Sequence, residues 1–266
     1  MSANSARILA VANQKGGVGK TTTAINLGTA LAQTGQRCLL VDLDPQGNAS
    51  TGLDKPADTR EQTTYDALSG DTDMNTVIVR TAIEGLDLAP ASVDLSGIDV
   101  ELVEDQQRAR RLAGLLTGPE GLASRYDIIL MDCPPSLNLL TVNAMVAAHG
   151  VIVPLQCEFF ALEGLSQLIS TVRQIQKTLN PGLRIDGIAL TMYDKRNRLS
   201  AQVADDVREN LGDVVYKTVI PRNVRLSEAP SHALPALIYD PYCAGSVAYR
   251  ELAAELLARY KKPNAA

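Results

Sequence analysis

The stretch NQKGGVGKTTT, residues 13–23, decides the fold. A short apolar run, RILAVAN (7–13), precedes it, and apolar side chains at helical spacing follow it as far as Gly35, a candidate helix cap. A strand, a glycine-rich loop and a helix in this order predict a phosphate-binding loop. Its glycines let several backbone N–H groups point into one concavity, and the helix adds the positive end of its dipole.

This loop predicts a nucleoside triphosphate as ligand, with Mg²⁺ as its ion. Lys20 would place a charge at the β- and γ-phosphates, and Thr21 would offer its hydroxyl to Mg²⁺. The residues expected at the nucleotide are Lys15, Gly16, Gly17, Val18, Gly19, Lys20, Thr21 and Thr22. The loop departs from the usual G-x-x-x-x-G-K-[ST] pattern, because Gln14 stands at the position of the first glycine. Lys15 is a second lysine in the loop, and a merely solvated side chain is its alternative reading.

The rest of the chain alternates strand-like and helical segments, which predicts an α/β fold. We expect a mostly parallel twisted sheet with helices on both faces, of the P-loop NTPase type, in one domain over residues 1–266 with flexible ends at 1–6 and 262–266. The expected strands are 38–44, 86–92, 126–132, 150–156, 184–194 and 214–221. The expected helices are 99–116, 137–149, 161–180, 200–212 and 244–261, and residues 54–82 stay unassigned.

Composition limits the function. The net charge of −5 argues against strong attraction of nucleic acid by the whole molecule, so such a role needs a local basic patch. The four cysteines are widely spaced, which fits core side chains in a reducing compartment rather than a metal site. No signal peptide or membrane-spanning run is present in the sequence. We therefore expect a cytoplasmic protein with no membrane partner.

Acidic residues end two of the apolar strands. Asp132 ends the strand at 126–132, where a carboxylate would hold Mg²⁺ through water; capping of a turn is its alternative. Asp42 and Asp44 alternate on the strand at 38–44 and should share one face. Asp44 could also cap the next segment. In parallel sheets ligands bind beyond the carboxyl ends of the strands, so these acids should lie near the glycine loop.

Four stretches resemble one family. KGGVGKTT (15–22) resembles the deviant Walker A motif of the ParA/MinD ATPases. LVDLDPQGN (40–48) and IILMDCPPS (128–136) resemble the companion motifs of its partitioning branch, and TVIPRNVRLSEAPS (218–231) resembles a signature of the ParA/Soj group. The resemblance covers nearly the whole chain.

The resemblance implies an ATPase that works as a dimer. Lys15 would reach across a nucleotide-sandwich homodimer to the partner's phosphates, and Asp44 would orient or activate the attacking water. The implied catalytic residues are thus Lys15, Lys20 and Asp44, with Asp42 supporting the Mg²⁺ shell. Met192, Pro221 and Asn223 would line the base pocket, although apolar strand ends are more often core. Slow turnover is expected, since the ATP state serves as a signal.

The resemblance also implies non-specific binding of duplex DNA by the ATP dimer. Between residues 184 and 225 there are eight lysines and arginines against six acids, which a solvated face would also explain. Arg196 and Arg225 match the family's DNA-binding arginines, and Arg198 is a neighbour. A ParB-like centromere-binding protein would stimulate hydrolysis, and the protein would associate with the nucleoid.

Three other readings stay open. One is a MinD-like ATPase that cycles on a membrane, although the C-terminal segment lacks an amphipathic anchor. The second is a ParA-like protein that positions another cargo or a plasmid. The third is a redox or transport member of the superfamily, which the cysteine spacing disfavours. About six residues precede the first strand, so an N-terminal helix-turn-helix domain is not expected.

Overall fold

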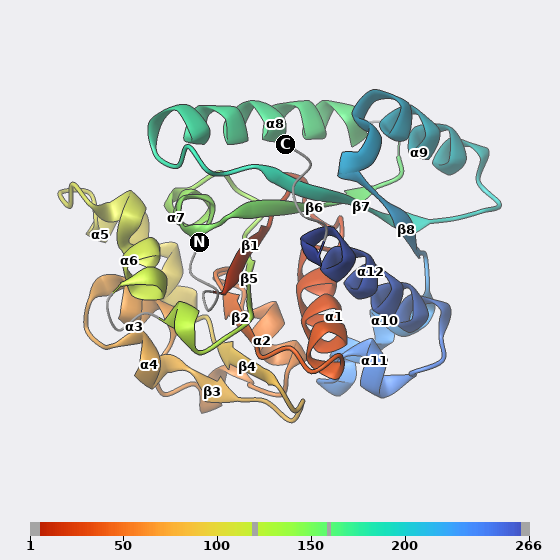
Figure 1. Cartoon of the computed structure of the whole chain (residues 1–266). Helices are drawn as coiled ribbons and strands as arrows, with labels where there is room; N and C mark the ends of the chain where they lie inside the picture. The colour runs from red at the N-terminus through yellow and green to blue at the C-terminus, as the bar shows by residue number, and fades with distance from the viewer. Residues whose placement is uncertain (1–5, 119–121, 159–160, 262–266) are drawn as a thin grey trace.

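The computed structural model describes residues 6–118, 122–158 and 161–261, and its centre is an eight-stranded sheet (Figure 1). The strand order is β3-β4-β2-β5-β1-β6-β7-β8. Only β3 pairs antiparallel with its neighbour, so the mostly parallel sheet that the sequence predicts is confirmed. The strands are β1 Arg7–Val11, β2 Cys38–Asp42, β3 Val79–Arg80, β4 Leu86–Ala89, β5 Ile128–Asp132, β6 Gly150–Gln156, β7 Ile185–Tyr193 and β8 Val215–Pro221.

Helices cover both faces of this sheet, as the sequence predicts. α3, α4, α6, α7, α8 and α9 contribute to the core on one face, whereas α1, α11 and α12 pack on the other (Figure 1). No helix in the described part of the chain is long and apolar enough to cross a membrane. The helices are α1 Lys20–Gln33, α2 Asn48–Gly52, α3 Thr64–Ser69, α4 Met74–Val77, α5 Ile98–Glu101, α6 Arg111–Thr117, α7 Leu139–Ala147, α8 Ala161–Thr178, α9 Arg198–Leu211, α10 Val224–Glu228, α11 Ala236–Tyr239 and α12 Ala244–Lys261.

The central strands are apolar except at their ends, because both of their faces are buried. In β1, Ile8 and Ala10 belong to the core on one face, and Leu9 and Val11 belong to the core on the other. β2 and β5 are also buried at every position. Parallel strands covered on both sides lose the alternation of apolar and polar residues, and this loss made them recognisable in the sequence.

Two predicted elements are broken or differ by more than two residues at one end, whereas the other expected strands and helices agree to within two residues at each end. The helix expected over 99–116 is broken into α5, a 3₁₀ turn at Arg108–Arg110 and α6. Asp105 supplies the reason, because its carboxylate accepts hydrogen bonds from the backbone N–H of Gln107 at 2.7 Å and from Nε of Arg111 at 2.6 Å. A side chain that caps the local backbone in this way competes with a continuous helix. The strand expected over 86–92 ends at Ala89, before Pro90.

The unassigned residues 54–82 contain α3, α4 and β3, and α2, α10 and α11 were also not expected. Each of these helices is only four to six residues long, too short to show a helical period. The expected flexible ends fall on residues 1–5 and 262–266, which lie outside the described residues, and on Ala6, which is buried.

A buried acid fastens the terminal helix to the sheet. The Asp186 carboxylate of β7 accepts a hydrogen bond from Tyr260 Oη of α12 at 2.9 Å and pairs with Arg7 of β1 at 3.0 Å. Next to it, Gly187 leaves room for the ring of Tyr216, which is fully buried. Arg259 of α12 stacks over the Tyr216 ring, and this ring fits against β7 only because Gly187 has no side chain. The packing of α12 therefore depends on a glycine at this position.

We expect Gly187→Ala to lower the free energy of unfolding by about 1–3 kcal/mol, because the added Cβ would collide with the Tyr216 ring in a closely packed core. Urea denaturation of the nucleotide-free chain would measure this change. Gly164→Ala in α8 is the matched control, since an added Cβ there meets no atom within 4 Å. Equal stabilities of the two variants would contradict this account of α12.

Candidate functional site

The glycine loop connects β1 to α1 at the carboxyl edge of the sheet. Gly17 and Gly19 have φ values of 74° and 89°, a region that favours glycine. Asn13 braces the loop, because its Nδ2 donates to the carbonyl of Pro154 at 2.8 Å and its Oδ1 accepts from the N–H of Lys15 at 3.0 Å. An added Cβ at Gly16 or Gly17 would meet no atom within 4 Å, so the space at this part of the loop is open.

Lys20 is the buried cation of the loop. Its side chain folds back so that Nζ donates to the carbonyl of Lys15 at 3.1 Å, and only 7% of the residue is exposed. Burial lowers the pKa of Lys20, and the negative charge of Asp132 is the strongest effect that opposes this shift. A cation without full compensation at the start of α1 is suited to hold phosphate oxygens.

Asp132 lies at the end of β5, in register with Asp42 on β2, and both are fully buried. Neither oxygen of Asp132 has a full hydrogen bond within the described residues, although the Thr21 hydroxyl is close enough to favour the charged form. Burial raises the pKa of Asp132 well above its usual value, and Asp42 raises it further. A buried carboxylate with two unused oxygens, beside a hydroxyl, fits a Mg²⁺ ion and its waters.

Asp42 is bound differently. Its Oδ2 accepts hydrogen bonds from the N–H and the hydroxyl of Ser50 at 2.9 and 2.7 Å, and its Oδ1 accepts from the N–H of Asp44 at 3.2 Å. Burial raises the pKa of Asp42 to about 6, and the Ser50 bonds oppose that shift. Asp42 thus holds the segment that follows β2, and its position suits support of a metal site rather than direct ligation.

Asp44 lies just beyond the end of β2 and is nearly buried, with 8% of the residue exposed. Its Oδ1 accepts a hydrogen bond from the N–H of Gln46 at 3.0 Å, so it also caps the following turn. The chain places Asp44, Asp132 and Lys20 close enough for their charges to act on one another. The glycine loop and the acids predicted from the sequence therefore do meet at one edge of the sheet.

Lys15 takes a different direction from Lys20. Its Nζ pairs with Oε1 of Glu158, in the segment after β6, at 3.0 Å. The two side chains are 39% and 41% exposed, so this ion pair is at the surface. The second lysine of the loop is thus held outside its own phosphate site and faces a region that a partner can approach.

The residues predicted for the base pocket line one cavity of about 300 Å³, together with Gly19 and Thr22. Met192 has a φ of 51°, an uncommon value for a side chain other than glycine or asparagine. Asn223 uses Oδ1 to accept from the N–H of Arg225 at 2.9 Å, which leaves its NH₂ group for a base. The cavity opens onto the loop at Gly19, so the base and phosphate positions are continuous.

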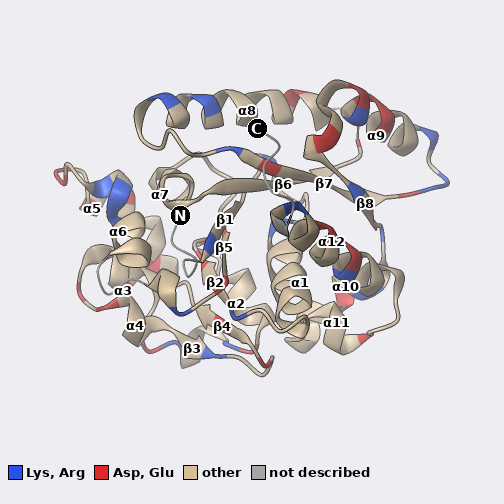
Figure 2. Ribbon diagram, in the orientation of Figure 1, with Lys and Arg blue, Asp and Glu red and all other residues tan. Residues whose placement is uncertain are grey.

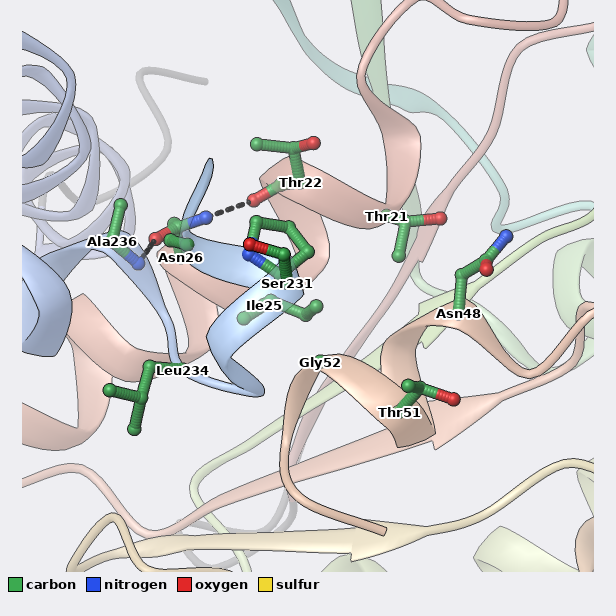
Figure 3. A pocket seen from close by; sticks show the side chains of 12 residues that line it. Thr21, Thr22, Ile25, Asn26, Asn48, Thr51, Gly52, Ser231, Leu234 and Ala236 are labelled. Atoms are coloured by element: carbon green, nitrogen blue, oxygen red, sulfur yellow. Dashed lines mark hydrogen bonds between the residues drawn. The ribbon is translucent and has the colours of Figure 1, made fainter. Parts of the chain in front are cut away.

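A second cavity, of about 430 Å³, lies on the other side of the α1 N-terminus (Figure 3). Thr21 and Asn26 of α1 line one side of it, Asn48 and Thr51 of α2 line another, and Ser231 closes a third (Figure 3). The turn at Ala229–His232, whose Pro230 also lines the base pocket, forms another part of its wall.

The three predicted DNA-binding arginines lie at the carboxyl ends of β7 and β8. Figure 2 shows basic residues on the loop that leads into α9 and near α10. Arg196 pairs with both oxygens of Asp194, at 3.1 and 3.0 Å, and Arg225 pairs with Glu228 at 2.8 Å and with Asp240 at 3.3 Å. Arg198 starts α9 and forms no ion pair with the residues described. Two of the arginines are therefore partly neutralised within the chain.

Some site residues were not predicted from the sequence. Thr191 donates to the carbonyl of Val18 at 2.8 Å, and Tyr249 Oη lies 3.1 Å from the Thr23 hydroxyl while its side chain lines the base cavity. Glu158 was also missed. All three reach the loop from distant segments of the chain, and no local pattern marks them.

The fold and this edge define a P-loop nucleotide-binding protein with two lysines in its loop, one folded back onto the loop and one paired at the surface. A family model described as an AAA domain matches residues 6–185. The chromosome partitioning protein ParA of Caulobacter vibrioides strain NA1000 is 58% identical over 259 residues, which are 97% of each chain. The sporulation initiation inhibitor protein Soj of Bacillus subtilis strain 168 is 52% identical over 252 residues, 95% of this chain and 98% of that one. The chain belongs to the ParA/Soj family of chromosome-partitioning ATPases, within the ParA/MinD type.

Solved structures agree with this fold. A Mycobacterium smegmatis protein described as cobyrinic acid a,c-diamide synthase, with bound ADP and magnesium, aligns with a TM-score of 0.83 at 38% identity. The alignment covers 97% of this chain and 96% of that one. A relative that holds both nucleotide and magnesium supports assigning the same pair of ligands to this family.

We expect Asp132→Asn to weaken Mg²⁺-dependent nucleotide binding by about 10–100-fold, the usual cost of losing a carboxylate that orients a metal's ligands. The same change should raise the melting temperature of the chain without nucleotide or Mg²⁺, because it removes a buried acid beside Asp42. Titration with a fluorescent ATP analogue, with Mg²⁺ or EDTA, and thermal melting would measure both effects. Undiminished Mg²⁺ dependence would contradict the assignment of Asp132.

Proposed function

We propose that this chain is an ATP-switched, DNA-binding ATPase that segregates chromosome or plasmid origins. ATP binding drives a nucleotide-sandwich homodimer, the dimer binds duplex DNA without sequence preference, and hydrolysis releases it. The observation that carries the ATPase role is the buried Asp132, with two unused oxygens, beside Thr21 and Lys20. The names of the 58% and 52% identical relatives support the partitioning role.

The residues of the edge divide the chemistry between them. Lys20 and the backbone N–H groups of the loop hold the β- and γ-phosphates, and Asn223 and Met192 hold the base. Thr21, and Asp132 through water, would hold Mg²⁺, which would neutralise charge on the phosphate oxygens. Asp44 orients the water for in-line attack, supported by the hydrogen bond from its N–H to Asp42. Turnover is slow until a ParB-like centromere-binding partner stimulates it.

Lys15 makes the switch depend on dimerisation. Two triphosphates that face each other concentrate negative charge, and a lysine from each partner offsets it only in the dimer. Binding energy that exists only in the dimer favours the dimer when ATP is present. The ion pair with Glu158 must break before Lys15 can reach a partner, so this pair opposes assembly in the single chain.

We therefore expect Glu158→Gln to strengthen ATP-dependent dimerisation. Each half-exposed ion pair contributes about 0.2–1 kcal/mol. The dimer loses one Lys15–Glu158 pair in each protomer, so removing both pairs beforehand would tighten the dimer by a factor of about 2 to 30. Sedimentation with ATP, in an Asp44→Ala background that slows hydrolysis, would measure this. Glu163→Gln, an exposed acid at the start of α8, is the control with the same change in charge. Weaker or unchanged dimerisation would show that Glu158 does not hold Lys15 back.

The proposed function is tested by titrating non-specific duplex DNA, and separately phospholipid vesicles, with ATP, ADP or no nucleotide. DNA binding should require ATP and weaken sharply with salt, because it is directed at phosphates. Binding to vesicles without binding to DNA would replace this proposal with a MinD-like membrane cycle. Binding to neither would contradict the DNA-binding step of this proposal.

Within the same titration, Arg196→Glu should abolish DNA binding and leave ATP affinity unchanged. Arg196 is exposed, pairs with Asp194, and lies far from the phosphate-binding loop in the sequence. Each lost phosphate contact should also reduce the slope of log affinity against log salt by about 1. Arg80→Glu on β3, at the opposite edge of the sheet, is the matched control, and Arg80 forms no ion pair with the described residues. ATP-dependent DNA binding by Arg196→Glu would remove the α9 loop from the interface.

A further inference from the structure

Arg60 comes from the segment to which the sequence assigns no chemistry. Its guanidinium donates four hydrogen bonds: Nε to the carbonyl of Lys55 at 2.8 Å, Nη1 to the carbonyl of Ala91 at 2.8 Å, and Nη2 to the carbonyl of Gly47 at 3.1 Å and to Oγ1 of Thr51 at 2.9 Å. It forms no ion pair within the described part of the chain. An arginine whose N–H groups bond to three carbonyls and a hydroxyl holds the backbone segments that carry those groups in place, and it forms no direct pair with an acid among the described residues.

These four bonds join the segment after Asp44 to the end of β4. Gly47 and Thr51 flank or belong to α2, and Ala91 follows β4. Gly47 has a φ of 60°, and an added Cβ at this position would collide with the guanidinium of Arg60. The glycine that starts α2 is therefore needed both for its backbone angle and for the close approach of Arg60.

The hydrogen bonds continue from Arg60 to the proposed catalytic acid. The N–H of Ala91, whose carbonyl Arg60 holds, donates to Oγ of Ser50 at 3.0 Å. Ser50 donates to Asp42 at 2.7 Å, and Asp42 accepts from the N–H of Asp44 at 3.2 Å. A continuous series of hydrogen bonds therefore links Arg60 to the backbone N–H of Asp44, by way of Ala91, Ser50 and Asp42.

Part of α2 borders a cavity. Asn48 and Thr51 face the cavity of about 430 Å³ that separates α2 from Ser231 and Leu234 (Figure 3). The cavity beside Asn48 and Thr51 leaves this short helix room to shift when the bonds of Arg60 are lost, although α2 also packs on α1 and on the turn at Ala229–His232. Arg60 bonds to α2 from outside the helix, through Oγ1 of Thr51.

We propose that Arg60 is a positioning residue for hydrolysis, which holds segment 47–51 against the end of β4 and so sets the place of Asp44. Among the described residues Arg60 forms no hydrogen bond with the glycine loop or the base pocket, so it acts through the bonds that lead by way of Ser50 and Asp42 to Asp44. This inference rests on the proposed ATPase function.

The test compares Arg60→Ala, Arg60→Lys and the control Arg80→Ala in DNA-stimulated ATP hydrolysis by the full chain. Arg60→Ala should lower kcat about tenfold and leave KM for ATP and the affinity for ADP nearly unchanged, because groups that orient a site from outside typically contribute 10–100-fold. Arg60→Lys should recover only part of the loss, because a lysine cannot make four bonds with this geometry. Arg80→Ala should behave as the wild type.

Two further measurements separate positioning from simple stability. In an Asp44→Ala background, Arg60→Ala should cause no additional loss of kcat, since both changes act on one group. Amide hydrogen exchange over residues 44–52 should be faster in Arg60→Ala than in Arg80→Ala. An unchanged kcat, an equal loss in the Asp44→Ala background, or a loss of ADP affinity in proportion to kcat would overturn the proposal. A wild-type chain that does not hydrolyse ATP would instead overturn the proposed function on which it rests.

Discussion

The site depends on two buried acids, Asp42 and Asp132, that the register of β2 and β5 places side by side. Burial raises the pKa of both carboxyl groups, and the neighbouring Asp42 raises the pKa of Asp132 further. The two acids are bonded unequally. Asp42 receives three hydrogen bonds from Ser50 and Asp44, whereas Asp132 is left without a full one. Asp42 holds the segment after β2 in place, whereas Asp132 keeps both oxygens available to bind a cation.

The same separation of roles applies to the two lysines. Lys20 is buried at the start of α1 and bonds to the carbonyl of Lys15, so the loop itself fixes its place. Lys15 has its backbone N–H held by Asn13 but its side chain paired at the surface with Glu158. In a single chain, therefore, the Lys20 side chain lies at the phosphate site and the Lys15 side chain points away from it. This geometry is compatible with the proposed role of Lys15 toward a partner.

The sequence predicts the parallel sheet and the glycine loop well, and it does so for identifiable physical reasons. Burial on both faces turns each central strand into an apolar run, and the loop needs glycine where φ is positive. α3 carried a usable local signal, since Thr63 and Asp66 form a capping box that spacing alone would suggest. The Glu158 pair and the bond from Arg60 to Ala91 could not be predicted, because each depends on which distant loops the fold brings together. The break at Asp105 is local, but a capping side chain inside a helical pattern does not show from sequence alone that it wins over the helix.

At the proposed DNA surface, weak ion pairs within the chain can determine how many phosphate contacts are needed before DNA binds. Arg196 and Arg225 are both paired with acids of their own loops, and such exposed pairs contribute only about 0–1 kcal/mol each. A polyanion competes with these acids, but one neutralised patch on a chain of charge −5 gains little from a single phosphate contact. In the proposed dimer two patches engage one duplex, and the second contact becomes intramolecular. The carboxylates beside the arginines would thus keep the single chain off DNA without preventing the dimer from binding, so the step from no binding to binding is steeper than it would be with free arginines.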